Sequence, residues 1–246
     1  MGSIGLCTDS GALLPSELVS LLGVTVVPAT VQVGEHEYLA GVDLDHDTLI
    51  DLLATGREPI SIVDPSAGQF ALAYEHLAAA GCTEIVSVHA SSKASATINA
   101  ARLAAHRSEV PVRIVECDTT GFGVSGCLWA VADVLAAEGT IDEAVAAAES
   151  VAGAVIALRL TDDTAELTTQ VAALGRPVRV GLGVGPRSLL HVADAYESVL
   201  AADPMVETVV RYRLTPTFDD HGHVCGSGIE CITFPAAPGS STPAAS

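Results

Sequence analysis

Basic residues are scarce in this 246-residue chain, which has 11 Lys and Arg against 30 Asp and Glu and a formal net charge of −19. A field of that sign repels nucleic-acid backbones and anionic membrane surfaces, so we expect no nucleic-acid partner. It also repels an anionic ligand at long range. Any bound carboxylate or phosphate must therefore be held by local hydrogen-bond donors.

Aromatic residues and long apolar runs are scarce as well. Phe, Trp and Tyr make up 4% of the residues and hydrophobic residues 49%, so the core must be built from Ala, Val, Leu and Ile. No apolar run approaches the ~20 residues that span a bilayer, which predicts no stable membrane insertion. The first residues lack a basic stretch followed by an apolar one, so we expect a cytoplasmic protein.

The six cysteines include no Cys-x-x-Cys pair and are expected to be free, mostly buried thiols. His221, His223 and Cys225 lie close together in the sequence. Their spacing suggests no fourth ligand for a zinc ion. We therefore expect neither a metal nor a cofactor.

Apolar patterns alternate between strand and helix periods along the chain. Strands are predicted over 5–9, 84–89 and 112–117, and one or two strands over 24–33. Helices are predicted to begin near 14, to extend over 45–55 and 66–80, to run from the polar turn at 90–97 to about 106, and to extend over 126–138 and 141–152. Further on, strands are predicted over 178–184, 206–213 and 230–234, and a helix over 188–201. The alternation predicts an α/β fold with a parallel sheet, which binds ligands beyond the carboxyl ends of its strands.

The pattern divides the chain into three parts. Residues 1–155 are predicted to form an N-terminal α/β domain and residues 156–234 a smaller C-terminal α/β domain. Residues 235–246 contain mainly Pro, Ala, Ser and Thr, a composition typical of a disordered tail.

Hydroxyl groups gather at residues 91–97, which we call the serine turn. Ser91, Ser92, Ser95 and Thr97 follow a predicted strand and open a predicted helix, where backbone N–H groups lack intrahelical partners and the helix dipole favours an anion. Lys93, the only lysine, lies in the same turn. One serine would suffice as a helix cap, so the excess of hydroxyls favours an anion site.

Three other polar segments have simpler interpretations. Thr8-Asp9-Ser10 fits a capping turn, and 59–66 fits a loop in which Asp64 or Ser66 caps the next helix. Residues 221–228 place His221 and His223 beside a Gly-Ser-Gly sequence, which is typical of a surface turn. A histidine there could also bind an anion or transfer a proton.

Four segments stand in one order along the chain: Thr8-Asp9-Ser10 with Leu14-Pro15 and Val26-Val27-Pro28, then Gly41-Val42-Asp43, then the serine turn, then His223 with Gly226-Ser227-Gly228. Together they resemble the DegV family, the fatty-acid-binding subunits of bacterial fatty acid kinases. The serine turn is the most specific of the four, being close to the family's Ser-Ser-x-x-Ser-Gly-Thr sequence.

The resemblance implies a long-chain fatty acid as ligand, lying between an N-terminal and a C-terminal α/β domain. Ser92 would bind the carboxylate, with Ser91, Ser95, Thr97 and His223 around it. A separate kinase catalytic subunit would phosphorylate the acid, so this chain would be a binding subunit and not an enzyme.

The sequence departs from the family pattern in three places. A threonine that binds the carboxylate in the family's Thr-Ser-Gln-Pro loop is here Ile62, which leaves Ser61 as a substitute donor and puts Asp64 near the head group. The serine turn has Ala96 where the family has glycine. The stretch between Leu160 and Val178 is much shorter than in the family.

Two alternatives stay open. The departures fit a divergent protein that binds another small anion. An acyl hydrolase with Ser92 as nucleophile and His223 as base is a second possibility, although the chain has no Gly-x-Ser-x-Gly sequence.

Overall fold

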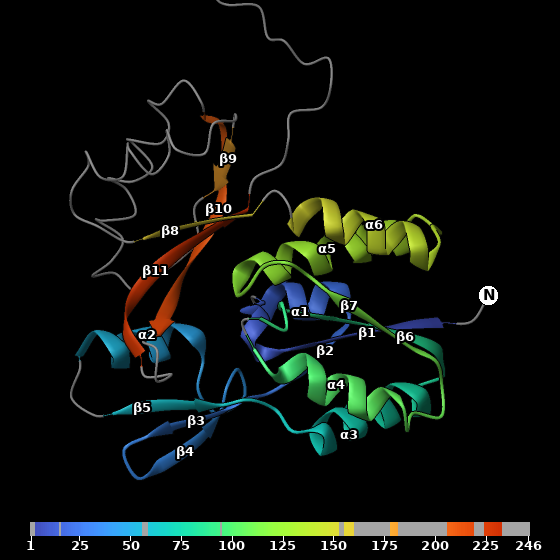
Figure 1. The fold of residues 1–246 in the computed structure, drawn as a ribbon, viewed down its shortest axis with the longest axis horizontal. Coiled ribbons are helices and arrows are strands. Elements are labelled where there is room, and N and C mark those ends of the chain that lie inside the picture. Colours follow the sequence, from blue (N-terminus) through green and yellow to red (C-terminus); the bar gives the residue numbers. More distant parts are fainter. Residues whose placement is uncertain are drawn as a thin grey trace, which may run out of the picture.

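The computed structural model describes residues 3–14, 16–55, 59–93, 95–152, 155–159, 178–181, 206–218 and 224–232 (Figure 1). Its strands form three sheets. The helix predicted over 188–201, the stretch between 160 and 178 and the tail over 235–246 lie outside the described residues, as does His223. Within the described residues, no helix is both long and apolar enough to cross a membrane.

The first sheet has the strand order β2-β1-β6-β7, with β1 Ser3–Asp9, β2 Val24–Val27, β6 Cys82–His89 and β7 Val112–Glu116. All of its pairings are parallel, which confirms the predicted α/β fold with a parallel sheet. The last five residues of β6 are all buried. Burial on both faces is what a parallel sheet covered by helices requires.

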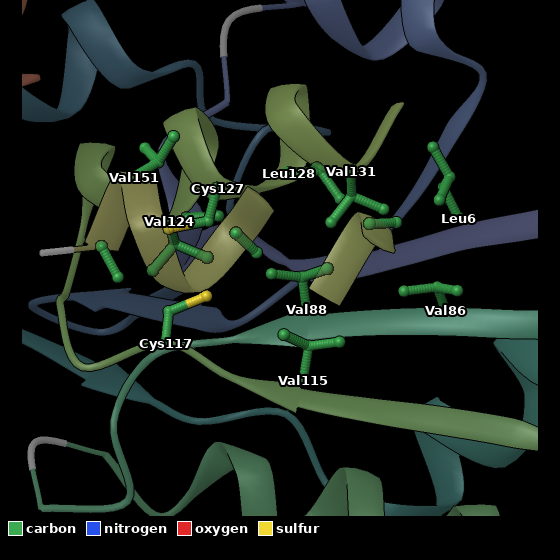
Figure 2. Close-up of a cluster of buried hydrophobic side chains, with 14 of the residues drawn as sticks. Leu6, Val86, Val88, Val115, Cys117, Val124, Cys127, Leu128, Val131 and Val151 are labelled. Carbon is green, nitrogen blue, oxygen red and sulfur yellow. The ribbon is translucent and has the colours of Figure 1, made fainter. Parts of the chain in front are cut away.

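Helices cover both faces of this sheet (Figure 1). On one face lie α5 Phe122–Ala136 and α6 Ile141–Ala152, packed on a cluster that includes Val86, Val88 and Val115 (Figure 2). On the other face lie α3 Ala67–Ala79 and α4 Thr97–Ala105, whose apolar residues pack against Cys7 and Ile85. Side chains of a strand alternate between these two faces, so the position of a polar residue in its strand determines which helices surround it.

The start of α5 differs from the prediction. The helix begins at Phe122 and not at Gly126. Three glycines at 121, 123 and 126 lower the local helix propensity, but Phe122 and Val124 are buried in the core. In addition, the Ser125 hydroxyl donates to the Ala12 carbonyl at 2.6 Å. Tertiary packing therefore overrides local propensity here.

The second sheet has the order β4-β3-β5, with β3 Thr30–Val33, β4 His36–Leu39 and β5 Ile60–Val63, and both pairings are antiparallel. The segment 24–33, predicted as one or two strands, is two strands in different sheets. The prediction of a loop over 59–66 is wrong for its first half, because Ile60–Val63 pairs with β3. The run is only four residues long and prolines flank it, so its strand character depends on the partner.

Two further helices form as predicted: α1 Ser16–Leu22, which links β1 to β2, and α2 His46–Thr55, which follows β4 in the chain. Of the two caps proposed for α3, Asp64 and Ser66, the structure shows Ser66. Ser66 is the N-cap, since it accepts from the Gln69 amide while its own N–H donates to the Gln69 side chain.

The third sheet has the order β8-β11-β10-β9, with β8 Val155–Arg159, β9 Val178–Gly181, β10 Val206–Phe218 and β11 Val224–Ile232. The surface turn predicted over 221–228 is wrong for residues 224–228, which belong to β11. Gly226, Ser227 and Gly228 pair with β10. Glycine weakens the local strand signal, and the long antiparallel pairing with β10 outweighs it.

Candidate functional site

The serine turn joins the end of β6 to the start of α4, as predicted. Ser91 is buried, and its N–H donates to the Thr119 carbonyl at 3.1 Å. The Ser91 carbonyl accepts from the Ser95 N–H at 3.1 Å. The Ser95 hydroxyl accepts from the Thr97 N–H at 3.1 Å and lies 2.9 Å from the Thr97 hydroxyl. The structure therefore brings Ser91, Ser92, Ser95 and Thr97 together in one hydrogen-bonded turn.

Two carboxylates of the protein reach the same turn. The Ser92 N–H donates to Glu116 Oε1 at 2.7 Å, and the Ser95 hydroxyl donates to Asp64 Oδ2 at 2.9 Å. Arg102 pairs with the other oxygen of Glu116 at 2.6 Å. Hydrogen bonds from the Ser92 side chain and backbone, followed by those from Arg102, lower the pKa of Glu116 to about 2. The turn thus holds a bound carboxylate, and that carboxylate belongs to Glu116.

Lys93 lies on the outside of the turn. Its Nζ is 3.7 Å from Asp118 Oδ1, and both side chains are 85% exposed. An ion pair this exposed contributes little to stability. Lys93 therefore behaves as a solvated loop lysine.

Ser61 and Ile62 occupy adjacent positions of β5, so their side chains point to opposite faces. Ile62 packs with Ile60 and Val31 in the core of the second sheet. Ser61 shares its face with Val63, which is 57% exposed. A ligand head group can meet one of the two side chains but not both.

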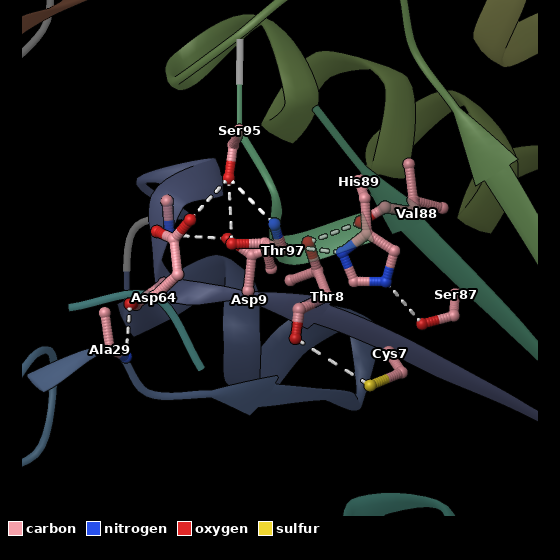
Figure 3. Close-up of polar contacts among 12 residues, drawn as sticks. Cys7, Thr8, Asp9, Ala29, Asp64, Ser87, Val88, His89, Ser95 and Thr97 are labelled. Atoms are coloured by element: carbon pink, nitrogen blue, oxygen red, sulfur yellow. Dashed lines mark hydrogen bonds and ion pairs between the residues drawn. The ribbon is translucent and has the colours of Figure 1, made fainter. Parts of the chain in front are cut away.

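A buried polar chain lies under the ends of β1 and β6 (Figure 3). Asp9 Oδ2 is 2.7 Å from His89 Nδ1, and His89 Nε2 is 2.8 Å from the Ser87 hydroxyl. The Tyr74 hydroxyl donates to Ser87 at 3.0 Å, and burial raises the pKa of Tyr74. The rings of His89 and Phe70 are nearly perpendicular, with centroids 5.2 Å apart.

The buried polar chain has the connectivity of a Ser-His-Asp triad, but its serine lacks the access to substrate that a nucleophile needs. Ser87 and His89 are fully buried and Asp9 is 7% exposed, so no substrate reaches the Ser87 oxygen. Asp9 also accepts from the Gly11 N–H at 2.9 Å, which confirms the capping turn predicted there. The arrangement ties this turn to the base of the serine turn.

Sequence reasoning missed Glu116, His89 and Ser87. One signal was available: alternation in the predicted strand over 84–89 places Ser87 and His89 on one face of a fully buried strand. Two buried polar side chains on one face need partners from neighbouring elements. The identity of those partners, Tyr74 and Asp9, depends on tertiary structure.

Sequence comparisons connect this chain to a known family. A family model described as "Uncharacterised protein, DegV family" matches residues 3–169. A DegV domain-containing protein of Streptomyces coelicolor is 36% identical over 146 residues, which are 59% of this chain and 52% of the relative. One from Deinococcus radiodurans is 32% identical over 149 residues, 61% of this chain and 53% of the relative. The chain spans about half the length of the curated relatives it matches.

Solved structures share the fold. A DegV family protein from Thermus thermophilus, described as binding fatty acid, matches with a TM-score of 0.72 at 18% identity. The match covers 95% of this chain and 100% of the Thermus thermophilus chain. A DegV family protein from Eubacterium eligens, loaded with heptadecanoic acid, matches with a TM-score of 0.65 at 15% identity. The match covers 94% of this chain and 99% of the Eubacterium eligens chain.

The buried polar chain predicts a specific pattern of stability changes. The substitution Ser87→Ala leaves the Tyr74 hydroxyl and one nitrogen of His89 buried without this partner, which costs about 1–3 kcal/mol of unfolding free energy. Adding Tyr74→Phe removes one of the two orphaned groups, so the double variant should lose less than the sum of the single variants. Urea unfolding of the four proteins measures both effects. Equal stability of wild type and Ser87→Ala would contradict this role for Ser87.

The charge on Glu116 gives a second prediction. Removing the guanidinium by Arg102→Gln should raise the pKa of Glu116 above about 2, short of its ordinary 4.5, because the Ser92 bonds remain. A lowered pKa means that Glu116 stabilises the fold above its unfolded pKa and that this contribution fades as the pH falls from about 4.5 to about 2. Carboxyl NMR across a pH series measures the pKa. The control is Arg113→Gln, which removes an exposed pair with Asp142 and should leave Glu116 unchanged.

Proposed function

The chain belongs to the DegV family, and from that premise we propose that it binds a long-chain fatty acid with the carboxyl group at the serine turn. The supporting observation is the position of the turn. It lies directly after the carboxyl end of β6, the edge at which parallel α/β sheets bind ligands. Solved DegV proteins of the same fold are described as binding fatty acids.

The hydroxyls of the turn suit a carboxyl group better than a catalytic role. Ser92 is exposed, and both its N–H and its side chain already bind a carboxylate, that of Glu116. A ligand carboxyl group has the same shape and acceptor atoms. Ser91, Ser95 and Thr97 complete the turn, and Ser61 or Ile62 of β5 and His223 are proposed to border the head group.

Binding can be tested by native mass spectrometry and by titration. Protein purified gently from its host should carry a mass increment of a long-chain acid, and delipidated protein should take up added palmitate. Ser92→Ala removes one hydroxyl donor and should weaken palmitate binding about tenfold. The matched control is Ser150→Ala at an exposed position of α6. Absence of any acyl ligand and of palmitate uptake would refute the proposal.

We also propose that the bound acid is the substrate of a separate kinase catalytic subunit and that this chain supplies no nucleophile. The burial of Ser87 and His89 supports a binding role. Palmitate-loaded protein mixed with a fatty acid kinase catalytic subunit and ATP should yield acyl phosphate. If palmitate binds but no acyl phosphate forms, the kinase partnership fails while the binding function stands.

A further inference from the structure

Four donors of the serine turn are already engaged within the protein, two of them by its own carboxylates. Glu116 accepts from the Ser92 N–H at 2.7 Å, and Asp64 accepts from the Ser95 hydroxyl at 2.9 Å. The Lys93 N–H donates to the Ser91 hydroxyl at 3.4 Å, and the Thr97 N–H donates to the Ser95 hydroxyl. A ligand therefore meets a turn at which two anionic groups stand on either side of the donors.

Charge around the turn is only partly neutralised. Glu116 of β7 pairs with Arg102 of α4, and Asp118 pairs with Lys93. Beneath the turn, Asp9 Oδ2 of β1 lies 2.7 Å from His89 Nδ1 of β6. Asp64 differs from Glu116 and Asp118: within the part of the chain that the structure describes, its bonded partner is a hydroxyl and not a cation. Asp64 is therefore the carboxylate that leaves excess negative charge at the turn.

A second carboxylate placed beside Asp64 would be repelled, because like charges at hydrogen-bond distance disfavour double ionisation. Two carboxyl groups in that position share one proton, as a neutral acid donating to a carboxylate. The alternative is a ligand head group that carries N–H or O–H donors of its own. Either way the favourable ligand is uncharged and donates a hydrogen bond to Asp64.

We propose that Asp64 makes this site selective for an uncharged acyl head group, so that the fatty acid binds in its protonated form and a neutral acyl amide binds as well or better at alkaline pH. This rests on the fatty-acid site proposed above. The ligand's O–H or N–H donates to Asp64, and its carbonyl oxygen accepts from the Ser92 hydroxyl, which exchanges Glu116 for the ligand while the Ser92 N–H stays on Glu116. Glu116 contributes by holding the Ser92 N–H, so that amide is not free to neutralise an anion.

The test is a titration of delipidated protein with palmitate and, separately, with palmitamide between about pH 5.5 and about pH 8.5. In the wild type, palmitate affinity should fall at least about fivefold as the pH rises, because binding takes up a proton, while palmitamide affinity stays constant. Asp64→Asn should remove most of the fall and favour palmitate over the amide at the higher pH.

The matched control is Glu84→Gln, which removes one negative charge from the opposite end of the same parallel sheet and should behave as the wild type. A pH-independent palmitate affinity in the wild type, or equal curves for wild type and Asp64→Asn, would overturn the inference while leaving fatty acid binding intact. Failure of both ligands to bind at every pH would instead refute the proposed function.

Discussion

The parallel pairing of β1, β6 and β7 is the constraint on which the rest of the structure depends. Asp9, His89 and Glu116 are the last residues of these three strands, so the pairing brings them to one edge. They also share one face of the sheet. Cys7, Ile85 and Ile114 stand an even number of residues before them in the same strands, so they point to the same face, and all three pack toward α3 and α4. The edge thereby receives a buried Asp-His pair and a carboxylate that binds the serine turn.

In the proposed complex, a strongly acidic chain would hold the acyl head group at this edge. Long-range attraction is absent at a net charge of −19, so the site depends on donors of the turn and on Arg102 of the adjacent helix. The same donors are occupied by Glu116 and Asp64. In that complex the protein's own carboxylates would set the charge of the head group, and the apolar tail would contribute most of the affinity.

Much of this was predictable from periodicity. The alternation of strands and helices predicted the parallel sheet, whereas the family was indicated by the resemblance of four segments, the serine turn above all. Strand β5 and residues 224–228 were mispredicted, because short or glycine-containing runs become strands only when a partner pairs with them. Glu116 was unpredictable for a related reason: nothing local in 112–117 shows that its carboxylate reaches Ser92, 24 residues earlier.

Binding of an acyl head group at the serine turn beside Asp64 can be tested by the NMR spectrum of the protein loaded with palmitic acid labelled with carbon-13 at its carboxyl group. We expect a single bound carboxyl resonance with the shift of a protonated acid at neutral pH, which moves toward the ionised position in Asp64→Asn. A bound resonance at the ionised position in the wild type, unchanged by Asp64→Asn, would show that Asp64 does not select a neutral head group.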